Sequence, residues 1–324
     1  MTRYDVFNGD ADGICGLLQL RLVQPCEAVL VTGVKRDVAL LRRVPSQAAA
    51  QVTVLDVSLD QNREALLGLL QGGSTVLYLD HHHAGAIPDH PGLTAVIDTT
   101  ADVCTSLLVD RHLGGACRLW AIAGAYGDNL TAAAEALADR VGLDEAGRVA
   151  LRELGESINY NAYVDSESDV LVHPAALFRL LLAHASPLGV MEREPLLRQL
   201  RDTRLEDLAQ ADALAPHAQC AGGRVFLLPD APWSRRVRGA WGNQLVHDAP
   251  GLAHAVLSPG EAGGYVVSVR APLRNLRGAD ALCRQFPTGG GRAAAAGINH
   301  LPQAGLGDFV RAFERAFAPA PEAA

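Results

Sequence analysis

The sequence predicts an α/β protein with a mainly parallel five-stranded sheet in its N-terminal part, a helical connector and a smaller C-terminal α/β domain. Three observations lead to this fold class. Short apolar runs alternate with helical patterns through residues 1–100. Residues 103–219 are rich in Ala and Leu and almost entirely helical in pattern, and strand-like runs return after residue 223. Strands separated by helices indicate βαβ units, whose parallel sheet carries helices on both faces.

The N-terminal sheet is predicted from five short runs rich in β-branched and aromatic side chains. These runs are residues 4–7, 28–31, 52–55, 75–79 and 94–97. Helices are expected at residues 14–23, where leucines recur at helical spacing, and at about residues 61–70. Residues 45–51 are interpreted as a surface loop.

The C-terminal part is predicted from strands at residues 224–228, 253–257 and 265–269 and a helix at residues 306–317. Helical periodicity ends in Pro and Gly at residues 214–223, which is typical of a linker. We therefore expect an N-terminal domain at residues 1–185, a helical linker at 186–222, a C-terminal domain at 223–318 and a disordered tail at 319–324.

The composition is that of a globular protein of about two domains, with 324 residues, 49% hydrophobic and 20% charged. No apolar run reaches the roughly 18 residues of a membrane span, and the start lacks a signal peptide's apolar region. We therefore expect a cytoplasmic protein without a membrane partner. A net charge of −8 argues against tight binding to long duplexes. The six cysteines form no C-x-x-C pair, which argues against a zinc ribbon.

Acidic and imidazole side chains follow three of the predicted strands. After the first, third and fourth strands these are Asp10, Asp12, Asp56, Asp80, His81 and His82. Because the carboxyl ends of parallel strands meet at one edge, where ligands bind in open α/β sheets, we expect these side chains to lie together. Asp128, at the end of a hydrophobic helical pattern, is one more candidate. Carboxylates and imidazoles bind hard and borderline divalent metals.

Each motif also has a simpler interpretation. An Asp-x-Asp-Gly run is typical of a turn, a lone Asp after a strand is typical of a helix cap, and Asp128 could cap a helix starting near residue 131. The run from Asn8 to Gly13 also imitates an EF-hand loop, but that loop would end at Gln19, which supplies no carboxylate. Their combination in one α/β frame favours a metal site over separate turns and caps.

The order of these motifs resembles the DHH phosphoesterase superfamily, which includes RecJ-type nucleases, nano-RNases, cyclic-dinucleotide phosphodiesterases and family II pyrophosphatases. The matching order is an Asp-x-Asp after strand one, an Asp after a middle strand, Asp-His-His, and then a later Asp. Residues 288–297 are similar to the Gly-Gly-Gly-His segment of the DHH-associated domain. The resemblance implies a catalytic, metal-binding domain at residues 1–185 and a substrate-binding domain at residues 223–318.

The resemblance implies two divalent ions, Mn²⁺ in first place, with Mg²⁺ or Co²⁺ as alternatives. Asp10 and Asp56 would bind one ion. The ligands of the other ion would be Asp12, Asp56, His81 and Asp128. His82 would contact the substrate phosphate and assist departure of the leaving oxygen, and Asp80 would orient the histidines.

One departure from the family pattern concerns the first ion. Many relatives carry a His just upstream of the Asp-x-Asp motif, where this chain has Val6 and Asn8. Asn8 or water would then complete the ligands of that ion, or the ion would bind weakly.

A second departure lies in the C-terminal domain. Arg292 stands where the family has a His after the three glycines, Gly289, Gly290 and Gly291. An Arg binds phosphate but gives up no proton near neutral pH, which shifts its expected role to substrate recognition. Arg270, at the end of a predicted strand, is a second phosphate-binding candidate, with a solvated strand end as the alternative interpretation.

The leading hypothesis is a metal-dependent phosphodiesterase or exonuclease-type hydrolase with a two-metal mechanism. Its expected partner is a small phosphorylated substrate, either a short single-stranded oligonucleotide or a cyclic dinucleotide. The alternatives are a pyrophosphatase or exopolyphosphatase, and a non-catalytic nucleotide-binding regulatory protein. The oligomeric state stays open, with a homodimer as one option.

Overall fold

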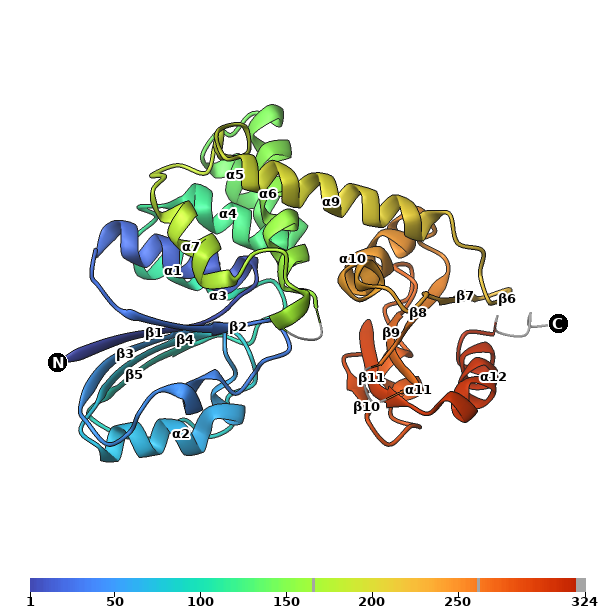
Figure 1. Cartoon of the computed structure of the whole chain (residues 1–324), viewed down its shortest axis with the longest axis horizontal. Helices are drawn as coiled ribbons and strands as arrows, with labels where there is room; N and C mark the ends of the chain where they lie inside the picture. Colours follow the sequence, from blue (N-terminus) through green and yellow to red (C-terminus); the bar gives the residue numbers. More distant parts are fainter. Residues whose placement is uncertain (165–166, 261–262, 319–324) are drawn as a thin grey trace. The chain divides into compact units, whose positions relative to one another are not determined.

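The computed structural model describes residues 1–164, 167–260 and 263–318 (Figure 1). The chain divides into two compact units, Met1–Thr203 and Arg204–Ala324. The division falls within the long helix Pro195–Asp212, inside the linker predicted at residues 186–222. The bounds predicted for the domains stay predictions. The tail expected to be disordered, residues 319–324, lies outside the described residues.

The first unit contains the predicted five-stranded parallel sheet. Its strands are β1 (Thr2–Asn8), β2 (Val29–Gly33), β3 (Ala50–Leu55), β4 (Thr75–Asp80) and β5 (Leu93–Ile97). They lie in the order β2-β1-β3-β4-β5, and every neighbouring pair is parallel. The order reverses direction at β1, so the crevice beside the carboxyl end of β1 is the position where ligands bind in such sheets.

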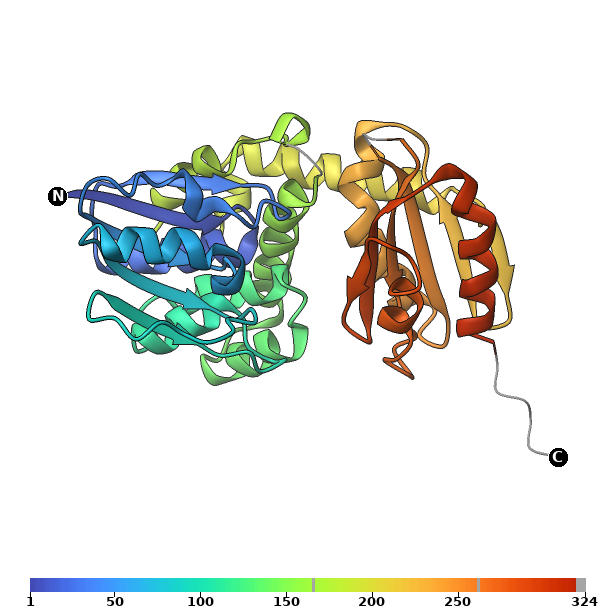
Figure 2. The ribbon, with the colours of Figure 1, turned by 90° about the horizontal axis from the view of Figure 1, so that it is seen from below.

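Helices cover both faces of this sheet, as the sequence predicts. On one face α2 (Leu59–Gln71) and the short 3₁₀ helix η1 (Leu40–Arg43) pack on the strands, and α1 (Ala11–Val23) packs on the other (Figures 1 and 2). Neighbouring residues of a strand point to opposite faces, so Val6 belongs to the α2 cluster and Phe7 to the α1 cluster. Both side chains are fully buried, as expected in a parallel sheet.

The rest of the first unit is helical and extends the core on the α1 side. Its helices are α3 (Thr105–His112), α4 (Arg118–Gly127), α5 (Thr131–Arg140), α6 (Glu145–Ala162), η2 (Glu167–Asp169), α7 (Pro174–Leu182), α8 (Val190–Arg193) and α9 (Pro195–Asp212), which continues into the second unit. The Ala/Leu-rich pattern at residues 103–219 therefore predicted the helical content correctly. The exception is residues 218–219 at its end, which belong to a short strand of the second unit.

The second unit is built on a mixed six-stranded sheet. Its strands are β6 (Ala218–Cys220), β7 (Gly223–Leu227), β8 (Ala253–Pro259), β9 (Tyr265–Arg270), β10 (Gly289–Gly291) and β11 (Ala295–Leu301), in the order β10-β11-β9-β8-β7-β6. The pair β7 and β8 is parallel and the others are antiparallel. The helices of this unit are α10 (Pro232–Asp248), α11 (Ala279–Cys283), η3 (Gln303–Gly305) and α12 (Leu306–Ala316).

Three strands of this sheet are absent from the sequence prediction. The three glycines Gly289–Gly291, for which no strand was predicted, form β10, and residues 218–220 of the predicted linker form β6. The segment of β11 is rich in Ala and Gly and lacks the β-branched run that marks a strand, so its pairing with β9 determines its structure. Among the described residues no helix is long and apolar enough to cross a membrane.

One buried histidine makes the stability of the second unit depend on pH. His254 of β8 is fully buried, and its ring stacks on Phe226 with 6.4 Å between centroids. Burial and the neighbouring Arg224 lower the pKa of His254 to about 4. In the unfolded chain a histidine binds its proton near pH 6.5. The unfolded state therefore binds more protons between about pH 6.5 and 4, and the free energy of unfolding should fall as the pH falls through this range.

Urea unfolding of the metal-free protein at pH 7 and pH 5, followed by tryptophan fluorescence, measures this effect. We expect His254→Leu to lose less stability between the two pH values than the wild type does. The matched control is His247→Leu, which removes an exposed histidine of α10 and should keep the wild-type dependence. An equal pH dependence in wild type and His254→Leu would contradict the assignment.

Candidate metal centre

The side chains predicted to form a metal site lie together at the carboxyl edge of the first unit's sheet. Asp10 and Asp12 follow β1 at the start of α1, Asp56 follows β3, and His81 follows β4. Asp128 comes to the same place from the end of α4. All four carboxylates lie close to the His81 ring or to one another, so the sequence-predicted cluster forms in space.

The turn between β1 and α1 fixes the first two carboxylates. The Asp10 Oδ1 atom accepts the N–H groups of Asp12 and Gly13, each at 3.1 Å, and so caps α1. A Cβ on Gly13 would lie 2.2 Å from the Asn8 carbonyl oxygen, so this tight turn requires glycine. The Asp12 carboxylate accepts the N–H groups of Thr105 and Ser106 at 2.7 Å each, which ties it to the first turn of α3.

His81 presents one ring nitrogen to three carboxylates. Its Nδ1 atom lies 2.9 Å from the Val103 carbonyl oxygen and donates to it, which leaves the Nε2 lone pair facing the centre. The Nε2 atom lies 3.5 Å from Asp56 Oδ1, 3.9 Å from Asp128 Oδ2 and 4.0 Å from Asp12 Oδ2. Ligand atoms that bind one ion at about 2.0–2.2 Å lie about 3–4 Å apart. Two groups of possible metal ligands therefore share His81: one adds Asp12 and Asp128, and the other adds Asp56 and His82.

The backbone near two of these ligands adopts the left-handed region. Asp56 has φ of 58°, and Asn129, directly after Asp128, has φ of 63°. Such conformations are unfavourable for residues other than glycine and occur often at functional sites. A Cβ on Gly127 would lie 2.2 Å from the Ala11 Cβ, so glycine lets the end of α4 approach α1. Asp128 does not cap α5, whose N-cap is Leu130.

His82 and Asp80 form a pair beside the carboxylate and histidine cluster. The His82 Nδ1 atom lies 2.7 Å from Asp80 Oδ1, and the Asp80 side chain is fully buried. The His82 side chain is 40% exposed, and because Nδ1 is bound to Asp80, Nε2 is the ring nitrogen left for another partner. Burial alone would lower the pKa of His82, but the hydrogen bond and charge of Asp80 raise it above its ordinary value. The pair agrees with the geometry expected for an orienting carboxylate and a phosphate-contacting imidazole.

Lys35 enters the centre, although the sequence analysis did not select it. It follows β2, and its Nζ atom lies 2.5 Å from Asp10 Oδ2 and 3.3 Å from Asp128 Oδ1. Burial would lower the pKa of Lys35, but the carboxylates, Asp10 foremost, raise it well above its ordinary value. One signal in the sequence could have found it, because Lys35 is the only lysine of the chain.

The centre carries more negative charge than the described side chains neutralise. Burial and the charges of Asp10 and Asp12 raise the pKa of Asp56 well above its usual range. Burial and the neighbouring carboxylates also raise the pKa of Asp128, against the effect of Lys35. Burial would raise the pKa of Asp10 as well, but Lys35 and backbone N–H donors hold it at about 2. Buried carboxylates that resist ionisation fit a site whose divalent cation supplies the missing charge.

Several predicted residues lie outside this ligand set. The Asn8 Oδ1 atom accepts the Asp10 N–H at 3.2 Å, so this candidate ligand makes a hydrogen bond within the turn between β1 and α1. Arg270, Arg292 and the glycines of β10 belong to the second unit. There the Arg270 guanidinium donates to Asn243 Oδ1 at 2.7 Å and to Ser268 Oγ at 2.9 Å, while Arg292 is exposed. Their role toward a substrate stays a prediction.

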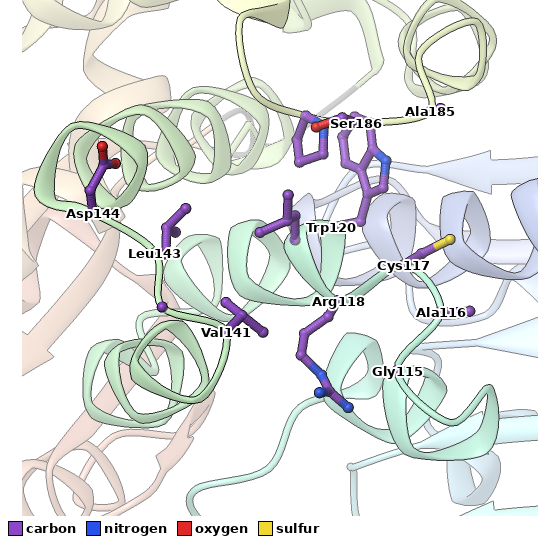
Figure 3. A pocket seen from close by; sticks show the side chains of 13 residues that line it. Gly115, Ala116, Cys117, Arg118, Trp120, Val141, Leu143, Asp144, Ala185 and Ser186 are labelled. Atoms are coloured by element: carbon purple, nitrogen blue, oxygen red, sulfur yellow. The ribbon is translucent and has the colours of Figure 1, made fainter.

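The first unit also contains a cavity of about 550 Å³ away from the centre (Figure 3). Arg118, Trp120 and Leu143 line it, together with residues near Ser186. None of the predicted metal ligands belongs to its lining. This cavity is therefore separate from the carboxylate and histidine cluster.

Metal binding should depend on His81 and not on its exposed neighbour. Loss of the Nε2 ligand in His81→Ala should weaken Mn²⁺ binding at least about 100-fold, because even outer-shell changes cost about 10–100-fold. Isothermal titration with Mn²⁺ measures the affinity. The control His83→Ala removes an exposed imidazole of the same loop and should bind as the wild type does. Equal affinities of the two variants would rule out the proposed ligand.

The sequence matches no protein-family model and no curated protein. Solved structures resemble it along nearly its whole length. Exonuclease RecJ bound to manganese has a TM-score of 0.61 at 22% identity, over 99% of this chain and 91% of that chain. RecJ from Thermus thermophilus in complex with Mn²⁺ has a TM-score of 0.59 at 21% identity, and the match covers 98% of this chain but 52% of that one.

A third similar structure is the pGpG-specific phosphodiesterase PggH from Vibrio cholerae. Its TM-score is 0.55 at 13% identity, over 99% of this chain and 100% of that chain. These similarities concern the fold, and they agree with the resemblance carried by the sequence motifs. The chain therefore has the DHH phosphoesterase fold, with a candidate Asp/His metal site at the carboxyl edge of its first sheet.

Proposed function

We propose that this protein is a metal-dependent phosphodiesterase that hydrolyses short oligonucleotides or small nucleotides, cyclic dinucleotides included. One observation carries the proposal: the His81 Nε2 atom faces three carboxylates within 4.0 Å, and the partly exposed His82 lies beside them. The fold is that of a manganese-bound exonuclease and of a phosphodiesterase named for a dinucleotide. A short substrate also suits an acidic protein, because it needs only a few local cationic contacts.

The residues that would hold the metal are Asp12, Asp56, His81 and Asp128, with Mn²⁺ as the preferred ion and Mg²⁺ or Co²⁺ as alternatives. When bound, such an ion stabilises charge on a phosphoryl oxygen and lowers the pKa of a water ligand. The carboxylates balance its charge, so that an anionic substrate meets a centre that is not strongly negative. Asp12 and His81 are pre-oriented by their bonds to α3 and to the Val103 carbonyl.

His82 supplies the proton for the leaving oxygen in this proposal. The Asp80 carboxylate holds the Nδ1–H and raises the pKa of the ring above its ordinary value, which favours the protonated form of His82. In this proposal the Nε2–H donates to a phosphate oxygen and then transfers its proton to the departing alkoxide. Arg292, Arg270 and the glycines Gly289, Gly290 and Gly291 would contact the substrate.

A panel of substrates tests the function directly. The panel contains a linear dinucleotide, a cyclic dinucleotide, a bisphosphorylated nucleotide and polyphosphate, each assayed in Mn²⁺. We expect mononucleotide release, and Asp56→Ala should lower kcat at least about 10²–10³-fold, because a buried charged group of the centre is lost. Release of inorganic phosphate from polyphosphate alone would favour the pyrophosphatase alternative. Bound Mn²⁺ without any hydrolysis would favour the non-catalytic alternative.

The role of His82 predicts a dependence on the leaving group. His82→Ala should lower kcat for a dinucleotide by about 10²–10⁴-fold, the usual contribution of a general acid. The loss should be much smaller for a p-nitrophenyl ester of a nucleotide, because p-nitrophenolate departs without a proton. Both rates are measured at saturating Mn²⁺. Equal losses on the two substrates would show that His82 does not act as the acid.

A further inference from the structure

The composition of the chain marks Lys35 as unusual. The sequence contains 28 basic residues of the Lys and Arg types, and Lys35 is the one lysine among them. Every other residue of these two types is an arginine. A lysine differs by ending in a compact, strongly charged ammonium in place of a broad planar fork. Its single use in a cluster of carboxylates therefore suggests that this position requires a small cation.

Four contacts hold the Lys35 side chain and backbone in place. The backbone N–H donates to the Ala162 carbonyl oxygen at 3.1 Å, which fixes the residue to the end of α6. The Nζ atom lies 5.1 Å from the centre of the Tyr163 ring, at a distance suited to a cation–π contact. The same atom contacts Asp10 Oδ2 at 2.5 Å and Asp128 Oδ1 at 3.3 Å. The ammonium is therefore positioned by its surroundings.

The ammonium uses the oxygens that a first metal ion would need. Asp10 Oδ2 contacts Lys35, and Asp10 Oδ1 accepts two backbone N–H groups of α1. The Asn8 Oδ1 atom accepts a backbone N–H of the same turn, and Val6 offers no ligand atom. The two groups of possible ligands found among the described residues, Asp12 with His81 and Asp128, and Asp56 with His81 and His82, both include His81, and neither includes Asp10. Asp10 and Asn8, which were expected to bind the first ion, are thus already engaged by other partners.

We infer that Lys35 replaces one of the two metal ions, so that the centre binds a single divalent ion next to the lysine ammonium. The inference rests on the proposed function, since it concerns the same metal centre. The charges agree with it. Four carboxylates, Asp10, Asp12, Asp56 and Asp128, meet three positive charges from one divalent ion and the ammonium. A second divalent ion would raise that number to five and would stand next to the ammonium, which it repels.

Counting bound Mn²⁺ tests the inference. The purified protein is equilibrated with Mn²⁺ by dialysis, and the metal is measured by mass spectrometry. We expect one ion per chain in the wild type and two in Lys35→Met, which keeps the aliphatic length and frees the oxygens of Asp10 and Asp128. The control Arg42→Met removes an exposed positive charge from the same segment between β2 and β3, and this variant should still bind one ion. Circular dichroism confirms that each variant is folded.

Electron paramagnetic resonance gives a second measurement that does not depend on activity. An isolated Mn²⁺ ion gives a six-line spectrum, whereas two ions about 3.5–4 Å apart couple and change it. We expect the six-line form in the wild type and the coupled form in Lys35→Met. Two ions in the wild type, or one ion in Lys35→Met, would overturn the role of Lys35. Neither result would contradict the proposed function as a metal-dependent phosphodiesterase. An ion count of zero in both proteins would overturn the inference and the proposed function together.

Discussion

Buried negative charge at one edge of the first sheet is the constraint on which the centre depends. Four carboxylates come together from β1, α1, β3 and α4, and burial makes their ionised forms unfavourable. Ionised carboxylates at this spacing are stable only if cations share the space. Lys35 provides one cation from within the chain, and the facing lone pair of His81 provides a ligand for another. The chain's own charges thus favour a bound cation at this edge.

The backbone around the centre is specialised to bring these groups together. Asp56 sits at positive φ, and glycine is needed where the β1 turn closes and where α4 meets α1. These conformations cost free energy locally, and the apolar packing of α1 against the sheet and of α4 against α1 offsets the cost. A centre assembled from four separate elements therefore relies on the stability of the whole first unit.

The N-terminal sheet and most residues of the carboxylate and histidine cluster could be predicted from the sequence, because each signal is local. Alternating strands and helices predict the parallel sheet, and a parallel sheet brings the residues after β1, β3 and β4 to one edge. The strands β10 and β11 could not be predicted, because glycine and alanine carry no strand preference and pairing with β9 decides their structure. Lys35 was missed because its connection to Asp10 and Asp128 exists only in the folded chain.

The bonds that Asp12 makes to α3 have a consequence for ion selectivity. Both of its oxygens accept backbone N–H groups at 2.7 Å, so this carboxylate cannot swing to follow a larger ion. Ca²⁺ takes about six to eight oxygens at about 2.3–2.6 Å and uses adaptable carboxylates, whereas smaller ions fit a short, fixed spacing. A rigid ligand therefore works as a size filter. We expect the centre to prefer small ions over Ca²⁺, because the first turn of α3 holds the Asp12 carboxylate in a fixed position.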